Sequence, residues 1–275
     1  MQLPRARRSG GAITNGRSAA VTHFNLDGRT AVVTGGNRGI GLGIARGLAG
    51  AGASILVVGR DAARNADAVE TIRRETGAAV GALAADVTRE ADAQAAIAAT
   101  VAQFGTVDIL VNCAGTNDRK APDQYSLAEW NDLIAVNLTS VFLMSVAAYP
   151  VMKQRQRGKI INIGSMFSLF GSGFAAPYAA AKAGVVQLTK SLGVSWGPDG
   201  IQVNAILPGW IDTELTREAR RQVPALDARV VARTPVGRWG ESSEIAGTAV
   251  YLASPASDFV TGAALPVDGG YSANG

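Results

Sequence analysis

Short apolar runs alternate with longer amphipathic stretches along most of this 275-residue chain. The runs are rich in β-branched and aliphatic residues, as in TAVVT and SILVV, and a glycine or polar residue closes each of them. Uninterrupted apolar runs of this length are typical of strands buried on both faces. The sequence predicts seven strands, at residues 29–35, 54–60, 78–86, 107–115, 158–165, 201–209 and 262–270.

The stretches between these runs have the spacing of amphipathic helices. Predicted helices cover residues 40–52, 61–76, 90–104, 126–157 in two pieces, 175–196 and 242–253. Ser126, followed by Glu129, is typical of the capping box that begins a helix. Strands that alternate with helices predict a parallel sheet covered on both faces. We therefore predict an α/β fold, a doubly wound parallel seven-stranded sheet of the Rossmann type, as a single domain over residues 26–275.

Composition and charge narrow the class of protein. Apolar residues make up 47% of the chain and charged residues 17%, which is enough for a large core. Residues 1–25 contain four arginines and no acid, so they account for the whole net charge of +4 and predict a flexible basic extension. The remainder is neutral, which argues against a nucleic-acid surface. DNA binding through the extension is the alternative, and it predicts salt-sensitive binding that is lost when the extension is deleted.

Several other functions are excluded by residues that are scarce. The one cysteine, Cys113, allows no intrachain disulfide and fits a reducing compartment, so we expect a cytoplasmic location. The one histidine, His23, lies in the extension, which argues against Ser–His–Asp hydrolysis and common zinc sites. No metal site is predicted. No run of about 18 uninterrupted apolar residues occurs, so no membrane span is predicted.

A glycine-rich segment, TGGNRGIG at residues 34–41, follows the first strand and opens the first helix. Its glycines, Gly35, Gly39 and Gly41, allow backbone N–H groups to approach a phosphate at a helix N-terminus. Glycines also serve ordinary tight turns, but the strand before and the helix after favour a nucleotide-binding loop.

The end of the second strand bears on which nicotinamide cofactor binds. Gly59 stands where an acid that binds the adenosine ribose is expected, and Arg60 follows it. Arg38, in the glycine loop, is a second nearby cation. These arginines favour NADP(H). NAD(H) is the alternative, with Arg60 solvated and Asp61 binding the ribose.

From Gly28 to Tyr271 the sequence resembles the short-chain dehydrogenase/reductase family. The resemblance is carried by the glycine motif, Asp86 in ADV, Asn-x-Ala-Gly at 112–115, Asn137 in VNL, Ser165, the Tyr-x-x-x-Lys pair, Pro208-Gly209 and Thr213. It implies an NAD(P)-dependent enzyme with catalytic residues Asn137, Ser165, Tyr178 and Lys182. The cofactor-binding residues that it implies, together with the loop arginines, are Gly35, Asn37, Arg38, Gly39, Ile40, Gly41, Arg60, Asp86, Val87, Asn112, Ala114, Gly115, Tyr178, Lys182, Pro208, Gly209, Ile211 and Thr213.

The tyrosine–lysine pair suits proton transfer to and from an alcohol. Tyr178 and Lys182 are four apart and share a helix face. Lowering a phenol pKa from about 10 to about 7 takes roughly 4 kcal/mol. An ammonium about 4 Å away supplies a similar amount at an effective dielectric of about 20. We therefore expect Lys182 to lower the phenol pKa.

The other two members of the tetrad have roles with structural alternatives. Ser165 is expected to hold the substrate oxygen by a hydrogen bond rather than only to satisfy backbone at a strand end. Asn137 is expected to position a water that relays protons from Lys182, and also to cap or bend its helix.

Two groups of residues bear on which substrate binds. Residues 212–240 are a candidate substrate lid. Its arginines either meet an anionic substrate or form a solvated helix face: Arg217, Arg220 and Arg221. Four nearby apolar residues either line the pocket or belong to the core or a subunit contact: Met166, Phe167, Phe170 and Trp210.

Three segments are most similar to family members that act on sugars and sugar acids, such as gluconate 5-dehydrogenase and 2-deoxy-D-gluconate 3-dehydrogenase. They are residues 125–142, 158–166 and 234–262. The resemblance implies oxidation or reduction of a sugar acid, sugar or polyol. The alternatives are a 3-oxoacyl-[acyl-carrier-protein] reductase and a non-catalytic dinucleotide-binding protein. The resemblance also implies a homotetramer, with helices near 130–155 and 176–196 at one interface and the last strand at another.

Overall fold

A seven-stranded, all-parallel sheet with strand order β3-β2-β1-β4-β5-β6-β7 forms the centre of the molecule. The computed structural model describes residues 23–274, so the predicted basic extension lies outside it except for its last three residues. The strands are β1 (Thr30–Thr34), β2 (Ser54–Gly59), β3 (Val80–Ala84), β4 (Ile109–Asn112), β5 (Gly158–Ile163), β6 (Ile201–Pro208) and β7 (Ala264–Val267). The predicted α/β doubly wound fold is therefore confirmed, with β1, β3, β4 and β7 shorter at both ends than predicted.

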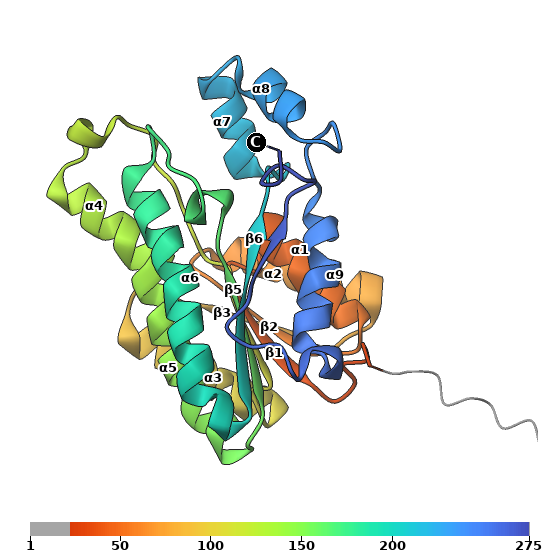
Figure 1. The fold of residues 1–275 in the computed structure, drawn as a ribbon. Helices are drawn as coiled ribbons and strands as arrows, with labels where there is room; N and C mark the ends of the chain where they lie inside the picture. Colours follow the sequence, from red (N-terminus) through yellow and green to blue (C-terminus); the bar gives the residue numbers. More distant parts are fainter. Residues whose placement is uncertain (1–22, 275) are drawn as a thin grey trace, which may run out of the picture.

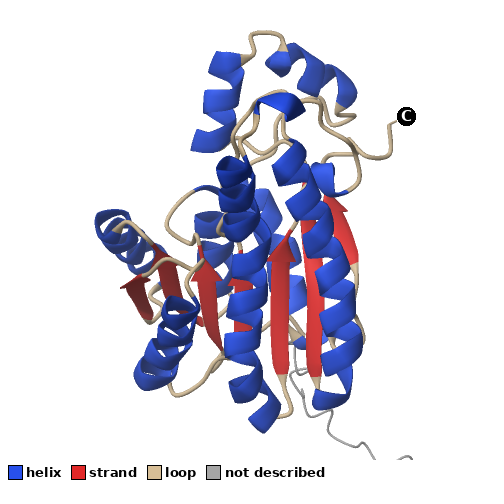
Figure 2. Ribbon diagram, turned by 90° about the vertical axis from the view of Figure 1, so that its left-hand side faces the viewer, coloured by secondary structure: helices blue, strands red, loops and turns tan. Residues whose placement is uncertain are grey.

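Helices cover both faces of this sheet (Figures 1 and 2). The helices are α1 (Gly39–Gly50), α2 (Ala62–Thr76), α3 (Glu90–Phe104), α4 (Leu127–Ile134), α5 (Ser140–Gln154), α6 (Ala176–Trp196), α7 (Glu214–Gln222), α8 (Leu226–Arg233) and α9 (Ser242–Ala253). Short 3-10 turns are η1 (Pro122–Gln124), η3 (Met166–Ser168), η4 (Gly197–Asp199) and η5 (Pro255–Ser257). Helices α1, α2 and α9 lie on one face, and α3, α5 and α6 lie on the other.

The two faces explain why the strands are apolar at consecutive positions. In β1, Val33 packs into the core beneath α1 and α9, whereas its neighbour Val32 packs into the core beneath α3 and α5. Val57 and Leu56 of β2 divide between the same two cores. Because successive side chains in a strand point to opposite faces, a sheet covered on both sides needs apolar residues at every position.

The long helix Leu127–Gln154 consists of α4, a π-helical turn η2 (Ala135–Thr139) and α5. It begins at the predicted capping box, in which Ser126 Oγ accepts from Glu129 N at 3.2 Å. One 18-residue window has a mean hydropathy of 1.7, and a third of that window is buried. By length and composition alone this helix is able to cross a membrane. In this fold it packs against α3, α6 and the sheet.

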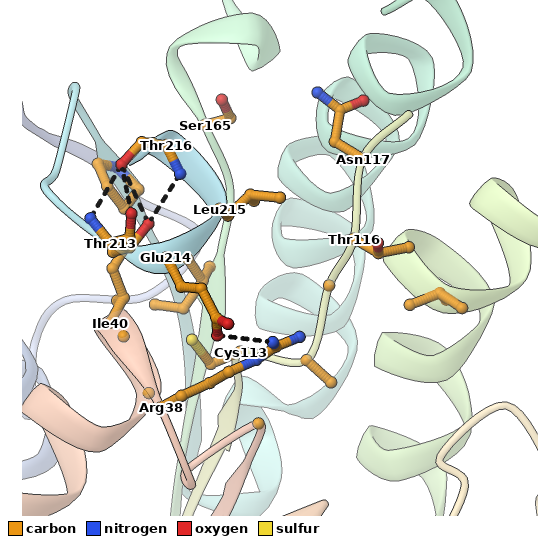
Figure 3. A pocket seen from close by; sticks show the side chains of 18 of the residues that line it. Arg38, Ile40, Cys113, Thr116, Asn117, Ser165, Thr213, Glu214, Leu215 and Thr216 are labelled. Carbon is orange, nitrogen blue, oxygen red and sulfur yellow. Dashed lines mark hydrogen bonds and ion pairs between the residues drawn. The ribbon is translucent and has the colours of Figure 1, made fainter. Parts of the chain in front are cut away.

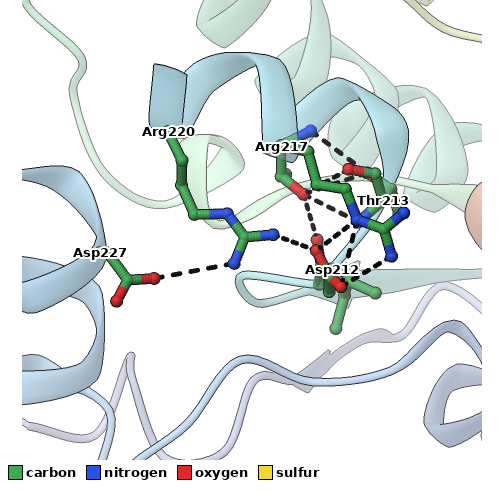
Figure 4. A network of polar contacts seen from close by, with 7 residues as sticks. Asp212, Thr213, Arg217, Arg220 and Asp227 are labelled. Carbon is green, nitrogen blue, oxygen red and sulfur yellow. Dashed lines mark hydrogen bonds and ion pairs between the residues drawn. The ribbon is translucent and has the colours of Figure 1, made fainter. Parts of the chain in front are cut away.

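Helices α7 and α8, in the segment predicted as a lid, stand beyond the carboxyl ends of the strands (Figure 1). Asp212 ties them together, since it pairs with Arg217 at 2.8 Å and also with Arg220, which lies 3.7 Å from Asp227 (Figure 4). The Arg220 guanidinium also lies 4.4 Å from the ring centroid of Trp239. Arg217 and Arg220 therefore both pair with Asp212 of the same segment. The sequence alone had left open whether they meet an anionic substrate or form a solvated helix face.

Candidate active site

A cavity of about 800 Å³ opens at the carboxyl ends of the strands, between the glycine loop and helix α7 (Figure 3). This is where ligands bind in doubly wound sheets. Almost all of the predicted site residues line it: Gly35, Asn37, Arg38, Gly39, Ile40, Gly41, Arg60, Asp86, Val87, Ala114, Gly115, Ser165, Tyr178, Lys182, Pro208, Gly209, Ile211 and Thr213. Asn112 and Asn137 do not line it.

The glycine loop is closely packed against the end of β4. Gly35 has a φ of +64°, and a Cβ there would lie 3.0 Å from the Cα of Ala114. Thr34 Oγ1 accepts hydrogen bonds from the backbone N–H groups of Cys113 and Ala114. Helix α1 begins here with no acidic residue in its first turn and no side chain capping its N–H groups. A helix start of this kind fits a phosphate group.

At the end of β2, two asparagine side chains occupy the space beside Gly59. A Cβ on Gly59 would lie 2.5 Å from Asn37 Nδ2 and 2.8 Å from Asn65 Oδ1. Asn65 is 2% exposed and donates hydrogen bonds to the carbonyl oxygens of Gly59 and Leu83. Asn65 therefore links the ends of β2 and β3. Its sequence neighbourhood gave no signal for this role, because Leu83 and Asn37 lie 18 and 28 residues away.

Asp61, the alternative ribose ligand, is engaged elsewhere. Its Oδ1 accepts from Arg64 N at 3.0 Å, so it caps helix α2, and its Oδ2 lies 3.4 Å from Arg64 Nε. Nearby, Asp86 is oriented by two hydrogen bonds from Thr88. Burial works against ionisation of Asp86, but these bonds and the charge of Arg60 lower its pKa overall. Asp86 therefore also lines this end of the cavity as a carboxylate, held in place by Thr88.

Helix α6 places Tyr178 and Lys182 together at the other end of the cavity. Lys182 is 4% exposed, and its Nζ lies 5.6 Å from the centroid of the Tyr178 ring. The same ammonium donates to the carbonyl oxygen of Ile163 at 2.7 Å. Burial lowers the pKa of Lys182 to about 8. The two side chains therefore share one helix face, as their spacing predicts.

The expectation of a lowered phenol pKa is not met for Tyr178, because burial outweighs the charges around it. Burial raises the pKa of the phenol above its usual value, although hydrogen bonding with the Ser165 hydroxyl and the charge of Arg119 work in the opposite direction. Desolvation penalises the phenolate, and the Lys182 ammonium is directed to the Ile163 carbonyl. The spacing of the pair cannot reveal that Lys182 is buried and Tyr178 half-buried.

Ser165 follows β5 and is positioned by the turn after it. Its Oγ accepts from Phe167 N at 3.1 Å. Ser168 Oγ accepts from Ser165 N and donates to the carbonyl oxygen of Lys182 at 2.7 Å. Ser168 therefore links the turn that carries Ser165 to the helix that carries the tyrosine–lysine pair. Sequence analysis missed this positioning residue.

Asn137 and Asn112 hold the scaffold through buried hydrogen bonds. Asn137 lies in the π-helical turn, and its Nδ2 donates to the carbonyl oxygens of Thr116 and Leu133 at 2.9 Å each. Asn112 Nδ2 donates to Ser145 Oγ and Asn162 Oδ1. For Asn112 we correct the implied cofactor contact, since its side chain is 3% exposed and faces α5 and β5 rather than the cavity.

The substrate end of the cavity combines aromatic and charged side chains. Met166, Phe167 and Trp210 line it, whereas Phe170 packs into a small core with Tyr271. The ring of Phe167 meets the rings of Tyr178 and Trp210 edge-on, with centroids 6.3 and 6.2 Å away.

Arg119 lines the same end of the cavity and is half-buried. Within residues 23–274 it forms no ion pair, and the nearby Glu218 is paired with Arg221 instead. Burial lowers the pKa of Arg119, against the opposing influence of Tyr178. Arg119 and its neighbour Asn117 follow the Asn-x-Ala-Gly motif, which was the available signal for them.

Comparison with known proteins identifies a family model and several relatives that match most of the chain. The family model described as enoyl-(acyl carrier protein) reductase matches residues 35–272. The chain is 43% identical to galactitol 2-dehydrogenase (L-tagatose-forming) of Cereibacter sphaeroides, over 91% of this chain and 98% of that protein. It is 42% identical to 5-keto-D-gluconate 5-reductase of Escherichia coli strain K12, over 90% of this chain and 96% of the relative.

A solved structure agrees with these relatives. Gluconate 5-dehydrogenase from Burkholderia cenocepacia J2315, in complex with NADP and tartrate, is 44% identical with a TM-score of 0.87. The match covers 92% of this chain and 98% of that one. The chain therefore belongs to the short-chain dehydrogenase/reductase family of NAD(P)-dependent oxidoreductases.

Proposed function

We propose that this oxidoreductase uses NADP(H) to interconvert a secondary alcohol and a ketone on a sugar acid. The observation that carries the substrate class is Arg119, a half-buried guanidinium without an ion pair in residues 23–274, in the cavity that holds Tyr178. A carboxylate on the substrate would satisfy that charge and set the distance from the acid group to the reacting carbon. The relatives that act on gluconates support the same class.

The side chains divide the proton chemistry among them. When bound, the nicotinamide exchanges a hydride with the carbinol carbon. Tyr178 accepts the hydroxyl proton in oxidation and donates it in reduction, while the Ser165 hydroxyl holds the same oxygen. Lys182 supplies positive charge beneath the phenol ring, at 5.6 Å from its centroid. Asn137 acts through the backbone that it holds, and we propose that its turn positions the water that reprotonates Lys182.

The residues present fit NADP(H). Gly59 stands at the end of β2 in place of an acid, Asp61 is used as a helix cap, and Arg38 and Arg60 line the cavity. Arginine at this place suits a 2′-phosphate. Two similar solved structures, a gluconate 5-dehydrogenase and a putative 2-deoxy-D-gluconate 3-dehydrogenase, contain NADP. Thr213, Pro208 and Gly209 complete the proposed nicotinamide end.

The buried lysine predicts the pH dependence of ketone reduction. Lys182 is protonated below its pKa of about 8 and loses its charge above it. Tyr178 stays protonated over the same range because burial raises its pKa. Since the ammonium stabilises the phenolate that forms as the proton leaves, kcat for reduction should decline above about pH 8. A steady-state profile between pH 6 and 10 checks this, and a flat profile would contradict it.

Substitution of Arg119 by methionine should separate charged from neutral substrates. Methionine keeps much of the apolar stem but removes the charge. Because a hydrogen bond to a charged group contributes about 1.5–3 kcal/mol, kcat/KM for 5-keto-D-gluconate should fall roughly 10- to 100-fold. A neutral polyol such as galactitol should change by less than about threefold. Equal losses on both substrates would rule out carboxylate recognition by Arg119.

A substrate panel tests the proposed function itself. The purified protein would be assayed with aldonates and their keto forms, neutral polyols and a 3-oxoacyl thioester, each with NADP(H) and NAD(H). We expect the highest kcat/KM on a sugar acid with NADP(H). Preference for the thioester would support the acyl reductase alternative, and cofactor binding without turnover on any carbonyl would support the non-catalytic one.

We also propose a cytoplasmic homotetramer. Apolar side chains on the long helices remain exposed on the monomer surface: Leu127, Trp130, Phe142, Val146 and Val194. Val194 is 81% exposed and Leu127 is 75% exposed. Exposed apolar side chains along these helices support a subunit contact there. Light scattering coupled to size-exclusion chromatography would measure the mass, and a monomer would contradict the proposal.

A further inference from the structure

Glu214, the first residue of α7, joins the lid to the adenosine end of the cavity (Figure 3). Its Oε2 accepts hydrogen bonds from Arg38 Nη1 at 3.1 Å and from Arg64 Nη1 at 3.0 Å. Arg38 belongs to the glycine loop and Arg64 to the first turn of α2. All three side chains line the cavity, and the two arginines lower the pKa of Glu214.

We propose that Glu214 is a determinant of cofactor selectivity, because it shares the guanidinium groups that a 2′-phosphate would bind. This inference rests on the proposed use of NADP(H). Three arginines gather at this end: Arg38, Arg60 and Arg64. Two carboxylates form ion pairs here, Asp61 with Arg64 and Glu214 with both Arg38 and Arg64. They offset much of the positive charge that would otherwise meet a phosphate carrying about −2.

The charge of Glu214 is expected to lower the affinity for NADP(H) and to leave the affinity for NAD(H) unchanged. A phosphate held by Arg38 or Arg64 comes close to the carboxylate that both already bind, so it must displace or repel Glu214. NAD(H) has a neutral hydroxyl at that position and does not compete. Replacing Glu214 by glutamine removes one negative charge beside both arginines, which favours the phosphate. Arg64, absent from the sequence prediction, is thereby a phosphate ligand beside Arg38 and Arg60.

The expected change in NADPH affinity depends on how exposed the three side chains are to solvent. The Arg38, Arg64 and Glu214 side chains are 57%, 45% and 62% exposed, so their ion pairs are partly screened by solvent. We expect Glu214→Gln to tighten NADPH binding about three- to tenfold, and to do so less at high ionic strength. Arg64→Met should have the opposite effect, weakening NADPH while leaving NADH within about twofold.

Dissociation constants for NADPH and NADH, measured by calorimetry on the full-length wild type and variants at low and high salt, test the proposal. Glu70→Gln on α2 is the matched control, because its side chain is 75% exposed and pairs only with Arg73 at 3.6 Å in the described residues. Tighter NADPH with unchanged NADH in Glu214→Gln supports the proposal. Unchanged or weaker binding of NADPH would overturn it. Equal changes in the affinity for NADPH and NADH would also overturn it, because they would mean that Glu214 acts on the dinucleotide as a whole and not on the phosphate.

The same experiment separates this inference from the proposed cofactor. If the wild-type protein binds NADH more tightly than NADPH, the proposed NADP(H) preference is wrong. A selective gain of NADPH affinity in Glu214→Gln would still support the inference in that case, because it would identify Glu214 as the group that excludes the phosphate. If the wild-type protein prefers NADPH but Glu214→Gln has no selective effect, the inference fails and the proposed preference stands.

Discussion

Replacing Tyr178 with phenylalanine is expected to lower kcat about 10²- to 10⁴-fold in both directions, the range that a positioned acid–base group contributes. The substitution removes only the hydroxyl, and the ring keeps its edge-on contact with Phe167. The Ser165 hydroxyl then remains to hold the substrate oxygen, but no group in contact with it can exchange the proton. Initial rates with a sugar acid and its ketone would measure the loss.

Two controls distinguish a loss of acid–base catalysis from a loss of cofactor binding or of folding. Binding of NADPH should stay within about threefold of wild type, because the hydroxyl is one of many cofactor contacts. Tyr251→Phe removes a hydroxyl from α9, on the opposite face of the sheet, and should leave kcat unchanged. Full activity of Tyr178→Phe would show that another group is the acid–base catalyst.

Gly41→Ala is expected to weaken NADP(H) binding about 100-fold or more. A Cβ on Gly41 would overlap the carbonyl oxygen of Gly35, and backbone atoms cannot move aside as a flexible side chain does. The glycine loop must shift, which takes its N–H groups away from the phosphates. Hydrogen bonds to charged groups contribute about 1.5–3 kcal/mol each, so losing two of them accounts for this factor.

Gly50→Ala in the same helix provides the matched control. A Cβ on Gly50 meets no atom within 4 Å, so alanine should bind cofactor normally and raise helix stability by up to about 1 kcal/mol. Thermal unfolding of both variants, beside calorimetric titration with NADPH, separates loss of binding from loss of folding. Normal NADPH affinity in a folded Gly41→Ala protein would contradict the close packing of the loop.

Local patterns were sufficient to predict most of the fold. Apolar runs such as TAVVT and SILVV predict strands because both faces of the sheet are covered. The capping box at Ser126 is a local motif and is present as predicted. The Tyr178–Lys182 spacing places both side chains in one cavity because four residues span about one helical turn. Each of these depends on neighbours within a few positions.

Groups that act across long chain separations were missed. Asn65 fills the space beside Gly59, Ser168 ties Ser165 to α6, and Glu214 reaches Arg38 from 176 residues away. Asn112 matches a motif by sequence, yet its side chain bonds Ser145 and Asn162 in the interior. No local pattern distinguishes these residues from ordinary surface or core residues.

The amino-acid sequence by itself determined the parallel sheet, the glycine loop and the identity of the tyrosine, serine and lysine that meet at its edge. The sheet follows from periodicity, whereas the three residues were indicated by resemblance to the short-chain dehydrogenase/reductase family. Only the tertiary structure decided the acidity of these groups: burial lowers the pKa of Lys182 to about 8 and raises that of Tyr178. Desolvation depends on every segment that covers a side chain, and the segments that cover these two come from separate parts of the chain.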